Sequence, residues 1–224
     1  MSSGSQTFVF ADLAGFTALT EVHGDDDAAD LVGAFCAAIE PLLAVHDTDQ
    51  IKVIGDAVML RAPTAEQGVG VALDIVCDVG RRPGFPTVRA GAHSGAAAER
   101  SGDWFGSAVN LAARVSGLAG GGEVLLTAAT RAAAGDIAGV RFEDHGWHRF
   151  KNVEDPVQVY VASREGAPAE LPIDPVCRMG VDPADRAGTL RHEDVEYSFC
   201  SLECARRFAG DPPRFTGVSA APRR

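Results

Sequence analysis

The pattern of apolar and polar positions divides most of the chain into alternating strand-like and helix-like runs. Short apolar runs typical of strands occur at 7–13, 87–93, 123–127, 141–150 and 157–162. Apolar residues at helical spacing predict helices over 27–45, 65–79 and 107–117. Between 50 and 61, two further strand-like runs flank Gly55-Asp56, a two-residue turn signal that predicts a hairpin. Hairpins mixed with crossover helices indicate an α+β sandwich, in which helices cover mostly one face of an antiparallel sheet.

The distribution of charge indicates a second, smaller domain. The 224 residues include 31 acidic and 20 basic side chains, giving a formal net charge of −11. From residue 172 onward acidic and basic side chains balance, so the negative charge belongs to the part before it. The segment 163–171 has no hydrophobic periodicity and holds the Gly and Pro of a linker. We therefore predict domains at 5–163 and 172–217 joined by a linker at 164–171.

Composition also excludes several classes of protein. The acidic balance argues against a generic nucleic-acid binder. We expect no apolar stretch of the roughly 20 residues that a membrane span needs. Residues 1–6 are short and polar and do not show the charged-then-apolar pattern of a leader. Five cysteines are too few and too unevenly spread for a secreted disulfide scaffold. We expect a cytoplasmic protein without nucleic-acid or membrane partners.

Two aspartates stand at predicted backbone turns. Asp12 lies where the first strand breaks into a glycine turn, and Asp56 lies in the tip of the hairpin. Two such carboxylates suit Mg²⁺, which prefers a couple of protein carboxylates together with water and phosphate oxygens. The backbone N–H groups of Gly15 and Phe16 can face a phosphate. Asp and Gly also simply form turns, so either aspartate alone has a structural explanation.

Polar residues on other elements extend this chemistry. Asn110 and Arg114 are four residues apart in one predicted helix and project from the same face, where they can hold phosphate or ribose oxygens. A solvated helix face is the alternative. Lys52 lies inside an apolar strand, where its charge calls for a partner or a ligand, unless it protects an edge strand. Only Lys52 and Lys151 are lysines among the basic residues, which suggests a need for an ammonium group.

Four ordered segments resemble the catalytic domain of class III adenylate and guanylate cyclases. They are Phe10-Ala-Asp-Leu-Ala-Gly-Phe-Thr17, Lys52-Val-Ile-Gly-Asp-Ala57, Arg89-Ala-Gly-Ala-His-Ser-Gly95 and Asp103-Trp-Phe-Gly-Ser-Ala-Val-Asn-Leu-Ala-Ala-Arg114. The resemblance covers roughly residues 7–163 and implies a ferredoxin-like antiparallel sheet with helices. The four segments occur in the family's order and at its intervals, so together they are far more specific than any one alone.

The resemblance implies a role for each matching residue. Asp12 and Asp56 match the metal-binding aspartates, which hold two Mg²⁺ or Mn²⁺ per site in this family. Lys52 and Asp103 match the pair that selects adenine, and guanylate-selective relatives typically have Glu and Cys there. Asn110 and Arg114 match the transition-state pair. Arg89 resembles a phosphate-contacting arginine, and Lys151 falls near the family's pyrophosphate lysine after a one-residue gap.

The activity implied is cyclisation of ATP to 3′,5′-cyclic AMP and pyrophosphate. In this family the site is shared across a head-to-tail homodimer, with the aspartates from one chain and the adenine and transition-state residues from the other. Two alternatives remain open: a guanylate cyclase, which Lys52 and Asp103 disfavour, and a catalytically silent dimeric scaffold.

The C-terminal segment resembles the YHS domain, a small metal-associated α+β module, over about 172–217. Asp174-Pro-Val-Cys-Arg-Met179 and Tyr197-Ser-Phe-Cys-Ser201 carry the resemblance, together with Cys204. Ser201 as an N-cap places Cys200 at the mouth of a helix and Cys204 one turn in, while Cys177 approaches from the preceding turn. Three soft ligands suit Zn²⁺ or Cu⁺. Buried, reduced core cysteines are the alternative.

Several details of the module stay open. His192 and Asp174 are candidates for a fourth ligand, and Arg178 stands where the family commonly has Gly. If metal binds, we expect it to tune the cyclase, through occupancy or through redox state.

Other polar and cysteine residues are expected to be structural. Cys36 and Cys77 fit apolar helix faces, and the acidic run 25–27 fits the start of a helix. His93 fits a strand end better than a catalytic base.

Overall fold

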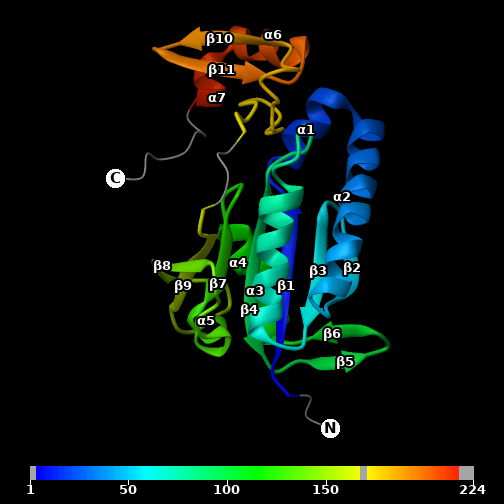
Figure 1. The fold of residues 1–224 in the computed structure, drawn as a ribbon, viewed down its shortest axis with the longest axis vertical. Helices are drawn as coiled ribbons and strands as arrows, with labels where there is room; N and C mark the ends of the chain where they lie inside the picture. The colour runs from blue at the N-terminus through cyan, green and yellow to red at the C-terminus, as the bar shows by residue number, and fades with distance from the viewer. Residues whose placement is uncertain (1–3, 167–170, 217–224) are drawn as a thin grey trace.

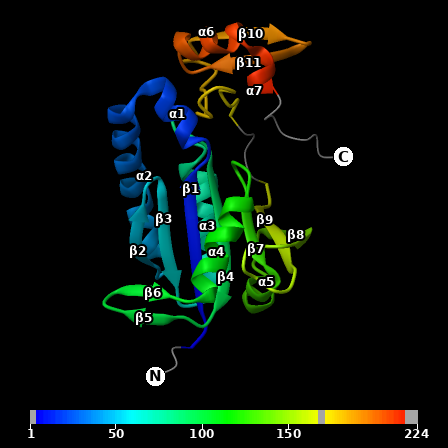
Figure 2. The same ribbon diagram turned by 180° about the vertical axis from the view of Figure 1, so that it is seen from behind.

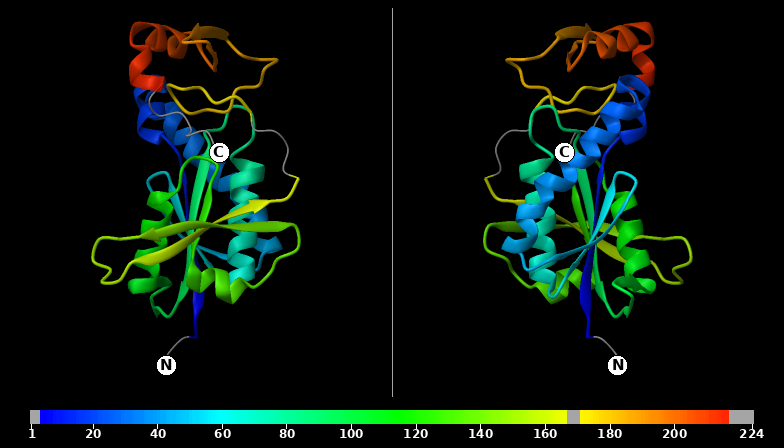
Figure 3. Two further views of the ribbon diagram at one scale, coloured as in Figure 1. Left: turned by 90° about the vertical axis from the view of Figure 1, so that its left-hand side faces the viewer. Right: turned by 90° about the vertical axis from the view of Figure 1, so that its right-hand side faces the viewer.

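The structure is a computed structural model that describes residues 4–166 and 171–216 (Figure 1). A large domain holds a central sheet with helices on both faces, and a small unit lies at one end of this sheet beside α1. The side views of Figure 3 show the same arrangement, with the small unit beyond the end of the strands. The α+β class predicted from the sequence is confirmed for the large domain.

The sheet of the described residues has seven strands in the order β2-β3-β1-β4-β7-β9-β8. The strands are β1 (Gln6–Leu13), β2 (Asp49–Ile54), β3 (Ala57–Ala62), β4 (Val88–Gly95), β7 (Val124–Thr127), β8 (Val140–His148) and β9 (Val157–Arg164). Its neighbouring strands are antiparallel, except that β4 and β7 run parallel. The β2–β3 hairpin turns at Gly55-Asp56 as predicted, and Gly55 takes the positive φ of 62° that such a turn requires. The sheet is therefore mixed, with β4 and β7 as its one parallel pair among the described strands.

Strand β1 is an interior strand of the sheet and pairs with β3 on one side and β4 on the other. Its register places Asp12 opposite Ala57 of β3 and opposite Arg89 of β4. Asp56 immediately precedes Ala57, so the same register brings the hairpin tip toward Asp12. Alternate β1 residues are buried on opposite faces, with Val9 and Ala11 in one apolar cluster and Phe8 and Phe10 in another.

Helices cover both faces of the sheet, which corrects the expectation that they lie mostly on one. In the large domain they are α1 (Phe16–His23), α2 (Asp25–Val45), α3 (Ala65–Asp74), the π-helical turn η1 (Ile75–Val79), α4 (Ser107–Leu118) and α5 (Ala128–Ala134). Helices α2 and α3 pack on the Val9 face, whereas α4 packs on the Phe8 face (Figure 2). Alternation along β1 makes both faces apolar, so each one requires a cover.

Three short segments of the large domain form elements that the sequence did not predict. Helix α1 occupies a segment treated as a phosphate loop, the hairpin of β5 (Ala98–Arg100) and β6 (Asp103–Phe105) occupies a polar loop, and α5 follows β7. These elements have eight residues or fewer, too short for a clear hydrophobic period. Helix α1 is held by burial of Leu19 in an apolar cluster rather than by its own propensity.

Helix α2 is the one helix in the described ranges that is long and apolar enough to cross a membrane, judged by length and composition alone. The sequence expectation that no stretch reaches this length is therefore wrong. Core helices pass the same test. In this fold, Phe35 and Ile39 of α2 are fully buried against the large domain's core.

The small unit spans residues 171–216. It begins with an irregular segment, 171–187, and continues with the hairpin β10 (Gly188–His192) and β11 (Val195–Phe199), then α6 (Leu202–Gly210) and α7 (Pro212–Thr216). Ser201 caps α6 as predicted, because its hydroxyl accepts a hydrogen bond from the Cys204 N–H at 3.1 Å. Of the linker predicted at 164–171, residues 167–170 lie outside the described residues, as does Gly217. Strand β9 includes Arg164, one residue beyond the predicted end of the first domain.

The small unit contacts the large domain through backbone hydrogen bonds and a shared apolar cluster. The Thr87 N–H donates to the Arg178 carbonyl at 3.2 Å, and the Gly180 N–H donates to the Phe85 carbonyl at 2.7 Å. The apolar cluster unites residues of both parts, namely Leu19, Ala28, Val176, Cys177, Phe199, Cys204 and Phe208. Burial of this cluster gives the two parts a common core.

Close packing at Gly91 fixes helix α4 against strand β4. A Cβ atom on Gly91 would lie 2.0 Å from the Ser116 nitrogen and 2.4 Å from its Cα, both backbone atoms of α4. Only glycine permits this approach. Because α4 also carries Asn110 and Arg114, the position of these side chains depends on it.

Gly91→Ala is expected to destabilise the protein by about 1–3 kcal/mol or more, since backbone rather than a flexible side chain must move. The measurement is the free energy of unfolding in urea. Gly117→Ala is the matched control, because Gly117 lies in the same helix and a Cβ atom there would have nothing within 4 Å. This control is expected to be neutral or to stabilise by up to about 1 kcal/mol. Equal effects of the two substitutions would contradict the packing argument.

Candidate functional site

The two aspartates predicted to bind metal face a common region. Asp12 is near the end of β1, and Asp56 is in the β2–β3 turn. Burial raises the pKa of Asp56, and the Asp12 carboxylate raises it further. This mutual repulsion means that the two carboxylates share one electrostatic environment, as the ligands of a cation do.

A side-chain cation already neutralises one of these carboxylates. The Arg89 Nε donates to Asp12 Oδ1 at 2.5 Å, and its Nη2 donates to Oδ2 at 3.0 Å, which is a bidentate pair between neighbouring strands. Arg89 also donates from Nη1 to the Ala119 carbonyl at 3.4 Å. The guanidinium stands where positive charge is favoured beside Asp12 and Asp56, so the residues fit a divalent cation.

The predicted adenine pair is formed within the chain. Lys52 Nζ donates to both carboxylate oxygens of Asp103, at 2.8 and 2.6 Å. The Trp104 N–H also donates to Asp103 at 2.8 Å, and these hydrogen bonds lower the pKa of Asp103. Both side chains remain about a third exposed. This partly exposed pair therefore presents a hydrogen-bond donor, the Lys52 ammonium, beside an acceptor, the Asp103 carboxylate, at the surface.

Asn110 and Arg114 lie one helical turn apart on α4, as predicted. Asn110 is exposed and Arg114 is half-buried. Within the described chain, neither side chain has a hydrogen-bond or ion-pair partner. An unpaired arginine on a rigid helix is available to a ligand or to a second chain.

The remaining residues predicted to bind substrate are Gly15, Phe16 and Lys151. Gly15 has φ of 82° and begins α1, where its carbonyl accepts from the Leu19 N–H at 3.0 Å. Phe16 is half-buried against the apolar clusters of the large domain and the small unit. Lys151 is exposed in the connection between β8 and β9. No described contact brings Lys151 to the aspartates of its own chain.

Residues expected to be structural occupy structural positions. His93 Nδ1 lies 2.8 Å from Thr127 Oγ1 between β4 and β7, and burial lowers the pKa of His93. Cys36 and Cys77 are half-buried free thiols, and burial raises the pKa of each. The acidic run 25–27 forms the first turn of α2, where it complements the helix dipole.

The three C-terminal cysteines converge as predicted. Cys177 Sγ lies 3.4 Å from Cys200 Sγ, which lies 3.8 Å from Cys204 Sγ. Hydrogen bonds from the other two thiols lower the pKa of Cys204, while those hydrogen bonds and burial raise the pKa of Cys177. The cluster therefore favours a thiolate on Cys204, and thiolates are the form that binds metal.

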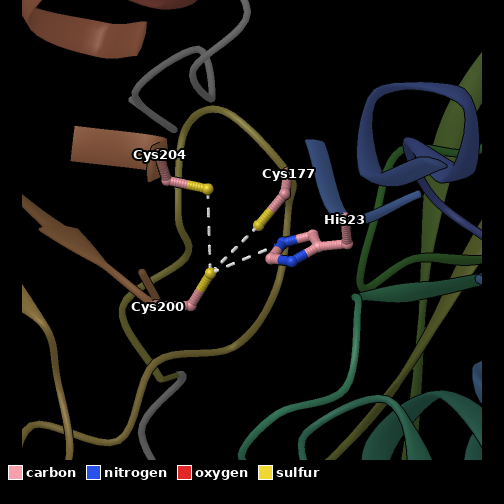
Figure 4. A group of neighbouring side chains, drawn as sticks. All are labelled: His23, Cys177, Cys200 and Cys204. Carbon is pink, nitrogen blue, oxygen red and sulfur yellow. Dashed lines mark hydrogen bonds between the residues drawn. The ribbon is translucent and has the colours of Figure 1, made fainter. Parts of the chain in front are cut away.

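The fourth polar member of this cluster comes from the large domain. His23, the last residue of α1, places Nε2 3.9 Å from Cys200 Sγ, and all four ligand atoms lie within 4.8 Å of one another (Figure 4). Sequence analysis missed His23, and no local signal in the sequence connects it to cysteines more than 150 positions away. Only contact between the two parts of the chain brings it there.

The candidates expected for this fourth position have other roles. Asp174 is fully buried and accepts hydrogen bonds from the Val176, Cys177 and Cys200 N–H groups at 2.8, 3.4 and 2.9 Å. It therefore holds the backbone that carries two of the cysteines. His192 packs edge-on against Phe208, with ring centroids 6.2 Å apart.

Similar proteins share the large domain. The chain is 38% identical over 161 residues to a pH-sensitive adenylate cyclase of Mycobacterium tuberculosis, covering 70% of this chain and 40% of that protein. It is 35% identical over 120 residues to an adenylate cyclase of Streptomyces coelicolor, covering 54% of this chain and 32% of that protein. The chain thus spans less than half the length of these relatives. No protein-family model matches the chain.

The fold agrees with the sequence similarity. An adenylate/guanylate cyclase/hydrolase of Silicibacter pomeroyi superposes with a TM-score of 0.65 at 25% identity, covering 72% of this chain and 98% of that structure. The large domain therefore has the mixed α+β fold of the class III nucleotidyl cyclases. The sequence relatives named as adenylate cyclases and the superposed cyclase structure thus show that the large domain is similar to cyclases, enzymes of the lyase class, in both sequence and fold.

Proposed function

We propose that the protein is an adenylate cyclase that converts ATP to 3′,5′-cyclic AMP and pyrophosphate. The observation that carries the choice of ATP is the Lys52–Asp103 pair, with Nζ 2.8 and 2.6 Å from the two carboxylate oxygens. An ammonium donates to adenine N1, and a carboxylate accepts from the N6 amine, whereas guanine presents the opposite pattern on that edge. The adenylate cyclases among the relatives support the same choice.

Each end of the nucleotide has chain residues to hold it. Asp12 and Asp56 would hold two Mg²⁺ or Mn²⁺ ions, which when bound lower the pKa of the ribose 3′-hydroxyl and neutralise the triphosphate. Arg89, which is paired with Asp12 in the structure, would contact phosphate oxygens, and Lys151 would hold the leaving pyrophosphate. Asn110 orients the ribose for in-line attack, and Arg114 stabilises the charge that develops on the α-phosphate.

The active form is a head-to-tail homodimer. Asn110 and Arg114 lack partners among the described residues of their own chain, which supports their use by a site completed by a second copy. Large apolar side chains are also exposed beside the adenine pair, including Val53, Ile54 and Phe105, which are 42%, 50% and 52% exposed. Such a patch on a charged domain is typical of an interface. The protein would act in the cytoplasm, without nucleic-acid or membrane partners.

The small unit adds a regulatory part. Its resemblance to the YHS domain and the convergence of Cys177, Cys200 and Cys204 support binding of Zn²⁺ or Cu⁺ there. The unit shares an apolar cluster with α1, which starts beside the phosphate-binding turn. Metal or redox state at the cysteines would therefore tune the cyclase.

Purified protein given ATP and Mg²⁺ or Mn²⁺ is expected to form cyclic AMP, and to form less cyclic GMP from GTP. Arg114→Ala is expected to lower the rate about a hundredfold or more, since donors placed for developing charge contribute about 3 kcal/mol. Arg100→Ala, which removes an exposed arginine from β5, is the matched control and is expected to keep full activity.

Preference for GTP would contradict the assignment of Lys52 and Asp103. Formation of neither product by a protein shown to be dimeric would favour the silent scaffold instead.

A further inference from the structure

Four ligand atoms from two separate parts of the chain have the spacing of a tetrahedral zinc site. Zn–S bonds of about 2.3 Å and a Zn–N bond of about 2.0 Å give tetrahedron edges of about 3.8 Å between sulfurs and about 3.5 Å between sulfur and nitrogen. The three separations from Cys200 Sγ are close to these edges, at 3.4 and 3.8 Å to the other sulfurs and 3.9 Å to His23 Nε2. The other three pairs of ligand atoms lie within 4.8 Å of one another. Three cysteines and one histidine form a common ligand set of structural zinc.

The surroundings suit this geometry. Cys177 and Cys204 are fully buried, and His23 and Cys200 are half-buried, so the position between them is largely screened from water. Asp174 orients the backbone of Cys177 and Cys200 through its hydrogen bonds. Partners that fix the ligands without binding the metal are typical of metal sites.

We propose that His23 is the fourth ligand of a structural zinc ion. This ion would connect the small unit to helix α1, a connection called the zinc clasp below. The proposal builds on metal binding by the three cysteines and adds that the site spans both parts of the chain. The clasp fixes the C-terminal end of α1, whose N-terminal end begins at Gly15. Occupancy of the site therefore restrains the segment that borders Asp12.

The test is zinc and cobalt binding by the reduced full-length chain. We expect one zinc per chain, and cobalt that gives the intense visible bands of a tetrahedral thiolate site. His23→Ala is expected to weaken zinc binding at least tenfold in a chelator competition, as the loss of a direct ligand should exceed the 10–100-fold cost typical of outer-shell partners. His192→Ala is the matched control, because that ring packs on Phe208, and its zinc affinity is expected to be unchanged.

Amide hydrogen exchange provides a readout of the clasp itself. Removing zinc from the wild type is expected to speed exchange in α1, whereas His23→Ala is expected to show fast exchange with or without zinc. The proposal is overturned if His23→Ala binds zinc as tightly as the wild type, or if zinc does not change hydrogen exchange in α1. It is also overturned if the cysteines bind copper but not zinc, or form a disulfide instead of binding metal.

A second inference rests on a different feature, an arginine-rich cavity between the two parts. The cavity has a volume of about 700 Å³ and is bordered by the backbone of Gly15, Gly120 and Gly121. Its arginines are Arg89 from the large domain and Arg178, Arg206, Arg207 and Arg214 from the small unit. Glu21 and Asp211 also line it. This excess of positive charge occurs in a chain of net charge −11, which suits a polyanion.

Arg178 differs from the other arginines of the cavity. Arg89 is paired with Asp12, Arg206 and Arg207 with Glu203, and Arg214 with Glu21. Among the described residues, Arg178 has no ion-pair partner. Its Cγ lies only 2.5 Å from the position that a Cβ on Gly15 would take, so its stem runs directly over the turn that follows β1.

The backbone at Arg178 is costly for an arginine. Its φ is 68°, in the left-handed region that favours glycine. The Arg178 N–H donates to the Asp174 carbonyl at 2.9 Å, and its own carbonyl accepts from Thr87, so the turn is held in this conformation. A side chain kept at a strained position is commonly a functional one.

We infer that Arg178 binds the polyphosphate tail of the nucleotide, so that the small unit supplies a phosphate ligand to the cyclase site of its own chain. The inference rests on the proposed function, because it takes the cavity beside Gly15 and Arg89 as the phosphate end of the site. A guanidinium without a carboxylate partner is free to bind phosphate oxygens bidentately.

The test is calorimetric binding of inorganic pyrophosphate and tripolyphosphate to the full-length chain, followed by the KM for ATP. Arg178→Gly, which relieves the backbone strain, is expected to weaken both polyphosphates about tenfold and to raise KM by a similar factor. Arg186→Gly is the matched control, since it removes an exposed arginine of the same unit outside the cavity. The affinity of this variant for both polyphosphates is expected to equal that of the wild type.

Equal binding by wild type and Arg178→Gly would overturn the inference, as would a faster cyclase in that variant, which would mean that the side chain obstructs the site. Failure of the proposed function is distinguishable. In that case the wild type makes no cyclic nucleotide, whereas polyphosphate binding still reports on Arg178.

Discussion

The pairing of β1 with β3 and β4 is the constraint on which the candidate site depends. It sets Asp12 opposite Ala57, directly after Asp56, and opposite Arg89 on the other neighbour. Three charged groups from distant segments are thereby held at one end of three adjacent strands. A shift of one residue in this register would turn Asp12 toward the opposite face and separate the carboxylates. The difference in size between Val9 and Ala11 on one face and Phe8 and Phe10 on the other opposes that shift, because a slip would exchange large and small side chains between two closely packed faces.

Helix α1 links this site to the small unit. It begins at Gly15, beneath the stem of Arg178, and ends at His23, beside the three cysteines. Leu19, between these ends, is buried with Phe199 and Phe208 of the small unit. One short helix thus connects the cysteine cluster with the glycine turn that follows β1. Coupling between two sites requires such a shared element, and α1 satisfies this structurally.

The sequence predicted the parts of the fold whose signals are local. Regular alternation identified the long strands, helical spacing identified α2 and α4, and Gly55-Asp56 identified the hairpin. The matched motifs also predict Lys52 and Asp103 as a pair, and the two side chains are hydrogen-bonded in the structure. Helix α1 and the β5–β6 hairpin were missed because they are too short to show a period and are held by tertiary contacts.

The relation between the two parts of the chain could not be predicted for a different reason. His23 acquires its significance only from neighbours distant in sequence, and nothing in its local pattern marks it. Arg178 is marked in the sequence only by its departure from the glycine common in the YHS domain that this segment resembles. The left-handed backbone at that residue explains the glycine and makes the arginine informative.

If the catalytic site is assembled from two copies of this chain, mixing two inactive variants restores activity. Asp12→Ala and Arg114→Ala are each expected to be nearly inactive alone, since each removes one half of every site. Mixed in equal amounts and allowed to exchange, half the dimers contain both variants, and each of these has one intact site. We expect recovery of about a quarter of wild-type cyclic AMP formation. A mixture that forms heterodimers and yet stays as inactive as its components would contradict the shared site.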